Sequence, residues 1–141
     1  MYATPKDLRN LKGFMSGADK RRSLTLDEFF AGWDESRQIF EALRAAVALV
    51  GAADLRVTKS QVAFARRKAF AWAWVPGRYL RGRTAPLVLT FVFPARDPSP
   101  RWKEIVQPAP GRFTHHLELF SADEIDAEVS AWLRLAWAAA A

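Results

Sequence analysis

Residues 61–75 read QVAFARRKAFAWAWV, and this stretch predicts a β-hairpin. Both halves are rich in β-branched and aromatic side chains, which fit a pleated, half-buried surface. Residues 66–68 (RRK) interrupt the apolar pattern and are expected to form the hairpin turn or an exposed strand end. In the second half, Phe70, Trp72 and Trp74 alternate with alanines, so one face of that strand is large and the other small. We therefore expect the tryptophans to pack in a core.

Further strands follow along the chain. Residues 86–94 read PLVLTFVFP and predict a strand over 87–93 that ends at Pro94. Residues 111–120 read GRFTHHLELF and predict another strand over 112–119. The Pro-rich stretch between these two strands is expected to be mostly loop, with a short strand near 103–106.

Two longer helices flank the strands. Residues 35–50 carry apolar side chains at helical spacing, and Asp34 or Ser36 is available to cap the first turn. Gly51 is expected to end this helix in a left-handed conformation. Residues 122–138 show the same spacing and predict the last helix.

Two stretches have the form of a capping box, in which a hydroxyl and a carboxylate three residues later satisfy backbone donors. Thr25-Leu-Asp-Glu28 predicts a short helix that ends near Gly32, and Ser121-Ala-Asp-Glu124 predicts the start of the last helix.

This order of elements predicts an α+β fold. Sequential strands with short links favour an antiparallel sheet, here of about four strands, with the N- and C-terminal helices packed on one face. We expect residues 25–141 to form a single domain and residues 1–24 to be a loosely docked arm with a short helical piece near 8–14. The side chains expected to be buried are Phe40, Leu43, Val47, Leu89, Phe91, Leu117, Val129 and Leu133.

The same stretches resemble a known family. QVAFARRKAFAWAWV after Lys59, LVLTFVF, GRFTHHLEL and SADEIDAEVSAWLRLAW are similar to a family of small bacterial domains of unknown function, the DUF5655 family. The resemblance covers roughly residues 29–138. It implies a domain that occurs alone or joined to larger chains, and it implies no particular chemistry.

Composition excludes several classes of function. The chain has no cysteine, so it has no disulfide, thiolate nucleophile or Cys-based zinc site. No apolar run approaches the roughly 20 residues of a membrane-spanning helix, and the first residues lack the apolar core of a secretory signal. We expect a cytoplasmic protein with no membrane association and no cofactor, and the sequence leaves its oligomeric state open.

The basic residues are concentrated in one region. Residues 55–96 hold nine Lys and Arg and no Asp or Glu, whereas the rest of the chain holds twelve basic and fifteen acidic residues. Lys and Arg neutralise phosphates, and aromatic side chains interleaved with them can stack on bases. The leading hypothesis is therefore a non-enzymatic binding module that meets an anionic partner, with nucleic acid as the first candidate. The candidate ligand-binding residues are Lys59, Arg66, Arg67, Lys68, Arg78, Arg81, Arg83 and His115.

The two histidines are adjacent, and in a strand they face opposite sides. His115 shares a face with Phe113 and Leu117 and is expected to be buried, whereas His116 shares a face with polar residues and is expected to be exposed. Opposite orientations also argue against a shared metal ion, so no metal site is expected.

No recognised motif joins a serine or threonine to either histidine as a nucleophile and base, and catalytic residues stay unassigned. The alternatives are a small-ligand pocket or an enzyme centred on His115 and Lys59, and a protein-interaction adaptor.

Overall fold

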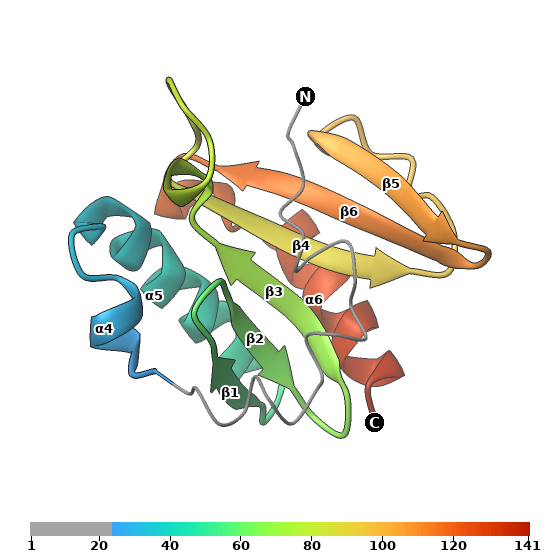
Figure 1. Cartoon of the computed structure of the whole chain (residues 1–141). Helices are drawn as coiled ribbons and strands as arrows, with labels where there is room; N and C mark the ends of the chain where they lie inside the picture. The colour runs from blue at the N-terminus through green and yellow to red at the C-terminus, as the bar shows by residue number, and fades with distance from the viewer. Residues whose placement is uncertain (1–23) are drawn as a thin grey trace.

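The computed structural model describes residues 24–141, which form a six-stranded antiparallel sheet in the order β1-β2-β3-β4-β6-β5 (Figure 1). The strands are β1 (Asp54–Val57), β2 (Val62–Ala65), β3 (Ala69–Trp74), β4 (Leu87–Phe93), β5 (Glu104–Ala109) and β6 (Arg112–Leu119). The helices are α4 (Leu26–Phe29), α5 (Asp34–Val50) and α6 (Ala127–Ala139), with single 3₁₀ turns η1 (Pro76–Arg78) and η2 (Ala122–Glu124). The α+β class and the antiparallel sheet are confirmed.

The prediction of about four strands is wrong, because the sheet has an extra strand at each edge. β1 has only four residues, and β5 contains Pro108 and is partly exposed along its length. Edge strands often lack a continuous apolar face, so their sequence signal is weak. The short strand expected near 103–106 is present as the first half of β5.

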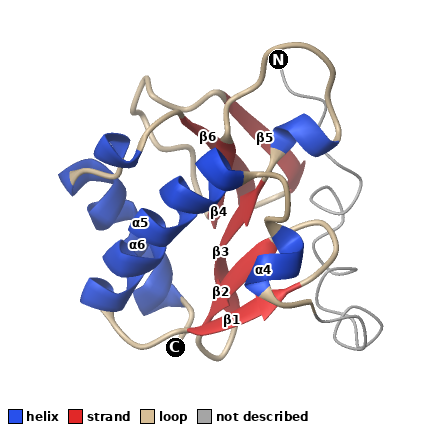
Figure 2. Cartoon of the chain, turned by 90° about the vertical axis from the view of Figure 1, so that its left-hand side faces the viewer, coloured by secondary structure: helices blue, strands red, loops and turns tan. Residues whose placement is uncertain are grey.

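Helices α5 and α6 lie together on one face of the sheet (Figure 2). All eight side chains expected in the core are buried there, each with at most 3% of its surface exposed. Ala71 and Ala73 of β3 face these helices, whereas Trp72 and Trp74 lie in a second buried cluster on the opposite face. The alanines on one face of β3 therefore let the helices pack close to the sheet. The tryptophans on the other face form the second buried cluster.

The predicted caps are partly right. Thr25 and Glu28 form the expected capping box at α4. Ser121 makes no cap bond, because α6 begins later, at Ala127. Its N-cap is Asp126, whose carboxylate accepts from the Val129 N–H. At α5 the N-cap is Trp33, and Ser36 instead donates its hydroxyl hydrogen bond to the Pro86 carbonyl at 2.6 Å.

Gly51 ends α5 for a different reason from the one predicted. Its φ of 168° is extended, not left-handed. A side chain at this position would overlap the indole ring of Trp137, whose Nε1 donates to the Ala52 carbonyl at 2.9 Å. The guanidinium of Arg66 lies 3.6 Å from the centre of a Trp137 ring and donates to the Trp137 carbonyl at 3.0 Å. Gly51 is thus required for the packing that fixes the end of α6 to the β2–β3 turn.

The arm predicted for residues 1–24 and its helical piece near 8–14 fall almost entirely outside the described residues. Both stay predictions.

Candidate binding site

The sheet divides between β3 and β4, and we call this division the fork. The two strands pair only over residues 72–74 and 88–90. The first residues of β3 pair only with β2, as far as the Ala69–Ala65 pair. The last residues of β4 pair only with β6, as far as the Phe93–Phe113 pair. Within the described sheet, residues 69–71 and 91–93 are therefore not paired with each other, and Figure 1 shows the two strands diverging in front of α6.

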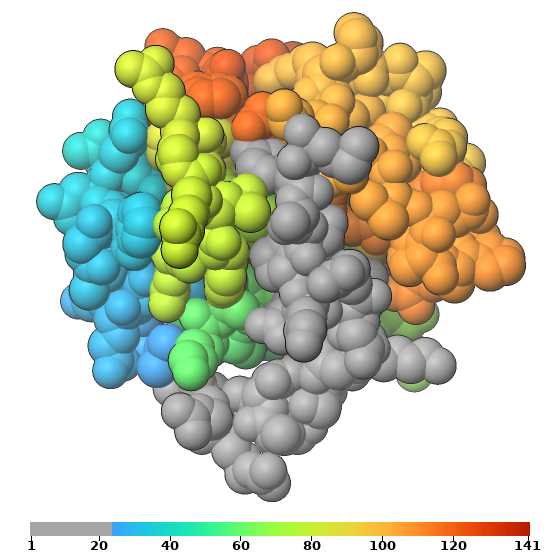
Figure 3. All heavy atoms as spheres, turned by 45° about the horizontal axis from the view of Figure 1, so that its top comes forward, coloured from blue at the N-terminus to red at the C-terminus, as the bar shows by residue number. Residues whose placement is uncertain are grey.

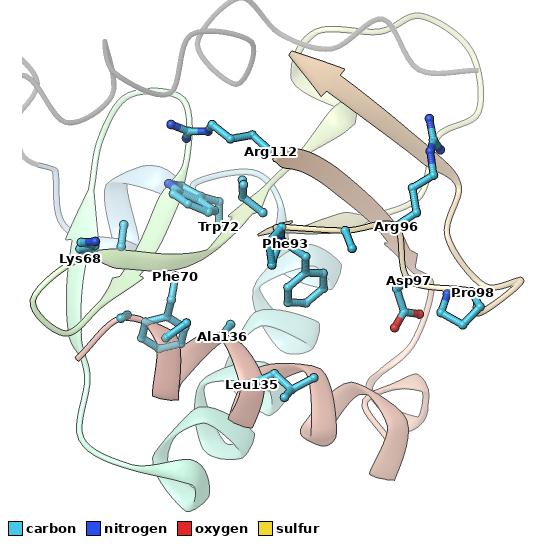
Figure 4. A pocket seen from close by; sticks show the side chains of 16 residues that line it. Lys68, Phe70, Trp72, Phe93, Arg96, Asp97, Pro98, Arg112, Leu135 and Ala136 are labelled. Carbon is cyan, nitrogen blue, oxygen red and sulfur yellow. The ribbon is translucent and has the colours of Figure 1, made fainter. Parts of the chain in front are cut away.

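A pocket of about 580 Å³ lies in the fork. Its walls include Phe70 and Trp72 from β3 and Phe93 from β4, and its α6 side is made by small residues and Leu135 (Figure 4). The volume and the apolar lining fall in the range typical of small-molecule sites. The sequence alone does not predict this pocket, because the pocket depends on where two adjacent strands stop pairing.

Three cationic residues line the pocket: Lys68, Arg96 and Arg112. Lys68 and the neighbouring Arg67 are exposed in the β2–β3 turn, as predicted, and Arg112 is the exposed first residue of β6. In Figure 4 the Arg112 side chain extends over the Trp72 ring, whereas Arg96 points away from the pocket. The guanidinium of Arg96 lies over the Phe113 ring at 5.3 Å. We call this side of the molecule the pocket end.

Three further predicted cations lie at the opposite end of β3, about 20 Å away for a six-residue strand. Lys59, Arg81 and Arg83 are exposed there, in the β1–β2 turn and in the 76–86 loop. This loop forms the yellow-green ridge of Figure 3. We call this side the loop end.

Two of the predicted cations have structural partners. Arg66 packs on Trp137 as described above, and Arg78 donates to the Phe29 carbonyl at 3.3 Å with its guanidinium 5.1 Å from the Phe29 ring. The predicted set therefore does not form one site. It divides into a group at the pocket end, a group at the loop end and two arginines that hold the fold together.

The ion pairs within residues 24–141 do not involve the basic region. They join Arg37 to Asp27 and Glu41, Arg44 to Glu41, and Arg101 to Asp126 and Glu128. The cations of residues 55–96 make no ion pair with a described acid. Their positive field is therefore not cancelled locally within this part of the chain.

His115 is buried, as predicted, and holds the loop that borders the pocket. Its Nδ1 lies 2.8 Å from the Phe113 carbonyl, and its Nε2 accepts from the Asp97 N–H at 3.0 Å. Because a carbonyl only accepts and an amide N–H only donates, the ring is neutral with its proton on Nδ1. Burial lowers the pKa of His115, although the Phe113 carbonyl and Asp97 oppose this shift.

Asp97 connects this loop to α6. Its carboxylate accepts from the indole N–H groups of Trp102 at 3.0 Å and Trp132 at 3.3 Å, and from the Ser99 N–H at 3.0 Å. Burial alone would raise the pKa of Asp97, but these hydrogen bonds hold it below its ordinary value. Asp97 is therefore a charged anchor for the pocket wall.

The prediction that His116 is exposed is wrong, because none of its surface is accessible. The opposite orientation of the two histidines is nevertheless as expected, since His115 pairs with Phe91 and His116 pairs with Thr90 across β4. His116 is buried because its ring packs edge-on against Trp74 of the second buried cluster, with ring centres 5.9 Å apart. Trp74 Nε1 donates to Thr90 Oγ1 at 2.9 Å, and Thr90 Oγ1 lies 2.8 Å from His116 Nδ1.

The Thr90–His116 pair joins a hydroxyl to an imidazole, but it lacks the properties of a nucleophile and base. Burial, with a smaller contribution from His115, lowers the pKa of His116 to about 4, which makes it a weak base at neutral pH. Neither side chain has accessible surface. The pair is therefore a structural contact between β4 and β6. It follows from the register of these two strands, in which Thr90 lies opposite His116.

Lys59 and His115, the centre of the alternative hypothesis, are not brought together. Lys59 lies in the turn between β1 and β2, and His115 lies on β6, which is separated from β2 by two further strands. Residues 24–141 contain no cluster of three or more His, Asp or Glu side chains suited to a metal ion. No helix in this range is long and apolar enough to cross a membrane.

Fold and site define a small α+β domain with a cation-rimmed apolar pocket in a forked sheet. The family model described as a domain of unknown function (DUF5655) matches residues 26–140, and the chain belongs to this family. Neither the curated proteins nor the solved structures contain a match to this chain.

Proposed function

We propose that this chain is a non-enzymatic binding module that recognises an anionic partner at its pocket end. The observation that carries the proposal is the position of Lys68 and Arg112, two exposed cations without a described ion pair, on the rim of a large pocket. The loop end supports it less, because the smaller cavity near it, of about 280 Å³, is lined by Asp34 and Glu35 and by no Lys or Arg.

The test compares two charge reversals of equal size. One variant carries Lys68→Glu and Arg112→Glu at the pocket end, and its control carries Arg81→Glu and Arg83→Glu at the loop end. Arg66 is left unchanged, because its contacts with Trp137 would confuse a loss of binding with a loss of stability.

Fluorescence anisotropy with labelled single- and double-stranded DNA, RNA and heparin measures binding between roughly 50 and 200 mM salt, where contacts to phosphates weaken steeply. We expect the pocket-end variant to lose at least tenfold in affinity and the loop-end control to lose less than threefold. Equal losses, or a larger loss at the loop end, would contradict the proposed site. Absence of binding by every polyanion would remove nucleic acid as the partner.

A further inference from the structure

The pocket has two chemically different parts, an apolar interior and a polar rim. We infer that its ligand is a small amphipathic carboxylate, with an alkyl or aryl body inside the fork and its carboxylate at Lys68, Trp72 and Arg112. The inference rests on the proposed recognition of an anion at the pocket end, and it names the class of that anion.

The fork explains why the interior is open. Continuing the register of β3 and β4 would place Phe70 opposite Val92 and Ala69 opposite Phe93, but these residues are separated and line the pocket instead. On the α6 side, Ala136, Ala139 and Ala140 leave room that larger side chains would fill. The result is a cavity with aromatic walls, into which an apolar body can be transferred from water at about 0.8 kcal/mol per CH₂ group.

Leu135 supports an apolar occupant. It lines the pocket with 63% of its surface exposed, although large aliphatic side chains are usually buried. An apolar chain lying in the fork would cover part of this surface. Isolated exposed leucines are common, but Leu135 lines the same pocket as Phe93 and the alanines of α6.

The polar rim contains a buried donor without an acceptor. Trp72 is 6% exposed, yet its Nε1 has no hydrogen-bond partner. A buried unsatisfied donor is destabilising, so an acceptor placed there is stabilising. In Figure 4 the indole nitrogen of Trp72 lies on the side of the pocket where Lys68 and Arg112 lie. A carboxylate at this position would accept from the indole and meet two positive charges.

The charges favour a single anionic group. Asp97, the acidic residue among the pocket-lining residues, already accepts from Trp102, Trp132 and Ser99, and Arg96 is turned toward Phe113. Lys68 and Arg112 are therefore the cations available to a ligand in the fork. A polyanion would use these cations without filling the apolar interior, which separates the two ligand classes experimentally.

The first experiment titrates the full chain with hexanoate, octanoate and decanoate, followed by isothermal calorimetry below the concentrations at which micelles form. We expect affinity to rise about threefold to fourfold per CH₂ until the pocket is full, as apolar burial requires. Decanol and decyltrimethylammonium, which share the alkyl chain, should bind at least tenfold more weakly than decanoate. Affinity that does not depend on chain length, or equal binding of the three decyl compounds, would overturn the inference.

The second experiment fills the pocket. Ala139 is exposed at the helix surface and lines the pocket. Ala139→Phe should therefore lower the affinity for decanoate at least tenfold without a change in thermal stability. The matched control is Ala138→Phe, because Ala138 is also exposed on α6 but does not line the pocket. Trp72→Phe keeps the aromatic wall, removes the donor and should weaken decanoate more than decanol. Unchanged binding by the Ala139→Phe variant contradicts the pocket.

The outcomes separate this inference from the proposed function. If polyanions bind through Lys68 and Arg112 but decanoate does not bind, the inference fails and the proposed function stands. If decanoate binds with the expected chain-length dependence and polyanions do not, the inference stands and the partner is a small molecule. If neither binds, both fail.

Discussion

The two ends of β3 carry similar numbers of exposed cations but differ in what surrounds them. At the pocket end, Lys68 and Arg112 stand beside an apolar cavity formed where β3 and β4 separate. At the loop end, Arg81 and Arg83 lie on a surface ridge, and the cavity nearby is lined by Asp34 and Glu35. Positive charge alone therefore does not distinguish the two ends, whereas the apolar cavity beside it does.

The largest expected effect concerns the scaffold that both ends share. Leu43 of α5 has no exposed surface, so Leu43→Ala should lower the free energy of unfolding by about 2–5 kcal/mol, through lost burial and a residual cavity. Leu49→Ala on the same helix should change it by less than about 0.5 kcal/mol, because Leu49 is 90% exposed. Urea titration measures both. Similar losses of unfolding free energy in the two variants would contradict the packing of α5 against the sheet.

The next effect lies at His116, in the sheet between the two ends. Its pKa is about 4 when folded and should be near the ordinary 6.5 when unfolded. Between these pH values only the unfolded state binds the proton. The contribution of His116 to the free energy of unfolding is therefore fully present above pH 6.5 and is lost as the pH is lowered toward 4. The loss should reach about 3 kcal/mol, at about 1.4 kcal/mol per pKa unit.

His116→Gln supplies the reference for this measurement. Urea titrations from pH 7 to 4 should show a smaller loss in the variant, since acids such as Asp97 contribute the same pH dependence to both proteins. Identical pH profiles would mean that His116 is not the buried neutral group described above.

A smaller effect is confined to the pocket end. Gly51→Ala should destabilise the protein by about 1–3 kcal/mol, because the added methyl group overlaps the Trp137 ring. In a Trp137→Ala background the same change should cost little, which a double-mutant cycle in urea would detect. An equal loss of unfolding free energy in both backgrounds would mean that Gly51→Ala does not destabilise the protein through contact with Trp137.

The smallest effect belongs to α4, whose Phe29 carbonyl accepts from Arg78 near the loop end. Thr25→Ala removes a capping box and should cost about 1 kcal/mol. Ser121→Ala should be nearly neutral, since Ser121 makes no cap bond. Thermal unfolding distinguishes the two, and a larger cost at Ser121 would contradict the observed start of α6.

Segments with a strong periodic pattern were predictable from the sequence, whereas at the edges of the sheet only the short strand near 103–106 was. The apolar spacing of α5 and the continuous apolar run of β4 each reflect burial along the whole element. β1 and β5 are half-covered edge strands, so their residues carry no comparable pattern. The start of α6 was misplaced because the sequence SADE satisfies the capping rule, although the chain forms only a 3₁₀ turn there.

The candidate site was predictable only in part. The excess of Lys and Arg in residues 55–96 identified Lys68 as a ligand-binding candidate, but Arg112 lies outside that segment and the pocket depends on strand separation. The Arg66 contact with Trp137 joins residues far apart in the sequence, so its structural role was not visible. His116 was expected to be exposed because its face of β6 is polar, whereas Thr90 and the Trp74 ring pack against the His116 ring.

The central claim is that the pocket in the fork, and not the loop end, binds a small amphipathic carboxylate. The most direct test is a titration of the isotope-labelled full chain with decanoate, followed through its backbone amide resonances. The account predicts saturable shifts at residues 68–72, 93–97 and 135–140, with residues 79–85 unaffected. Shifts confined to residues 79–85 and the β1–β2 turn, or no shifts at saturating decanoate, would contradict it.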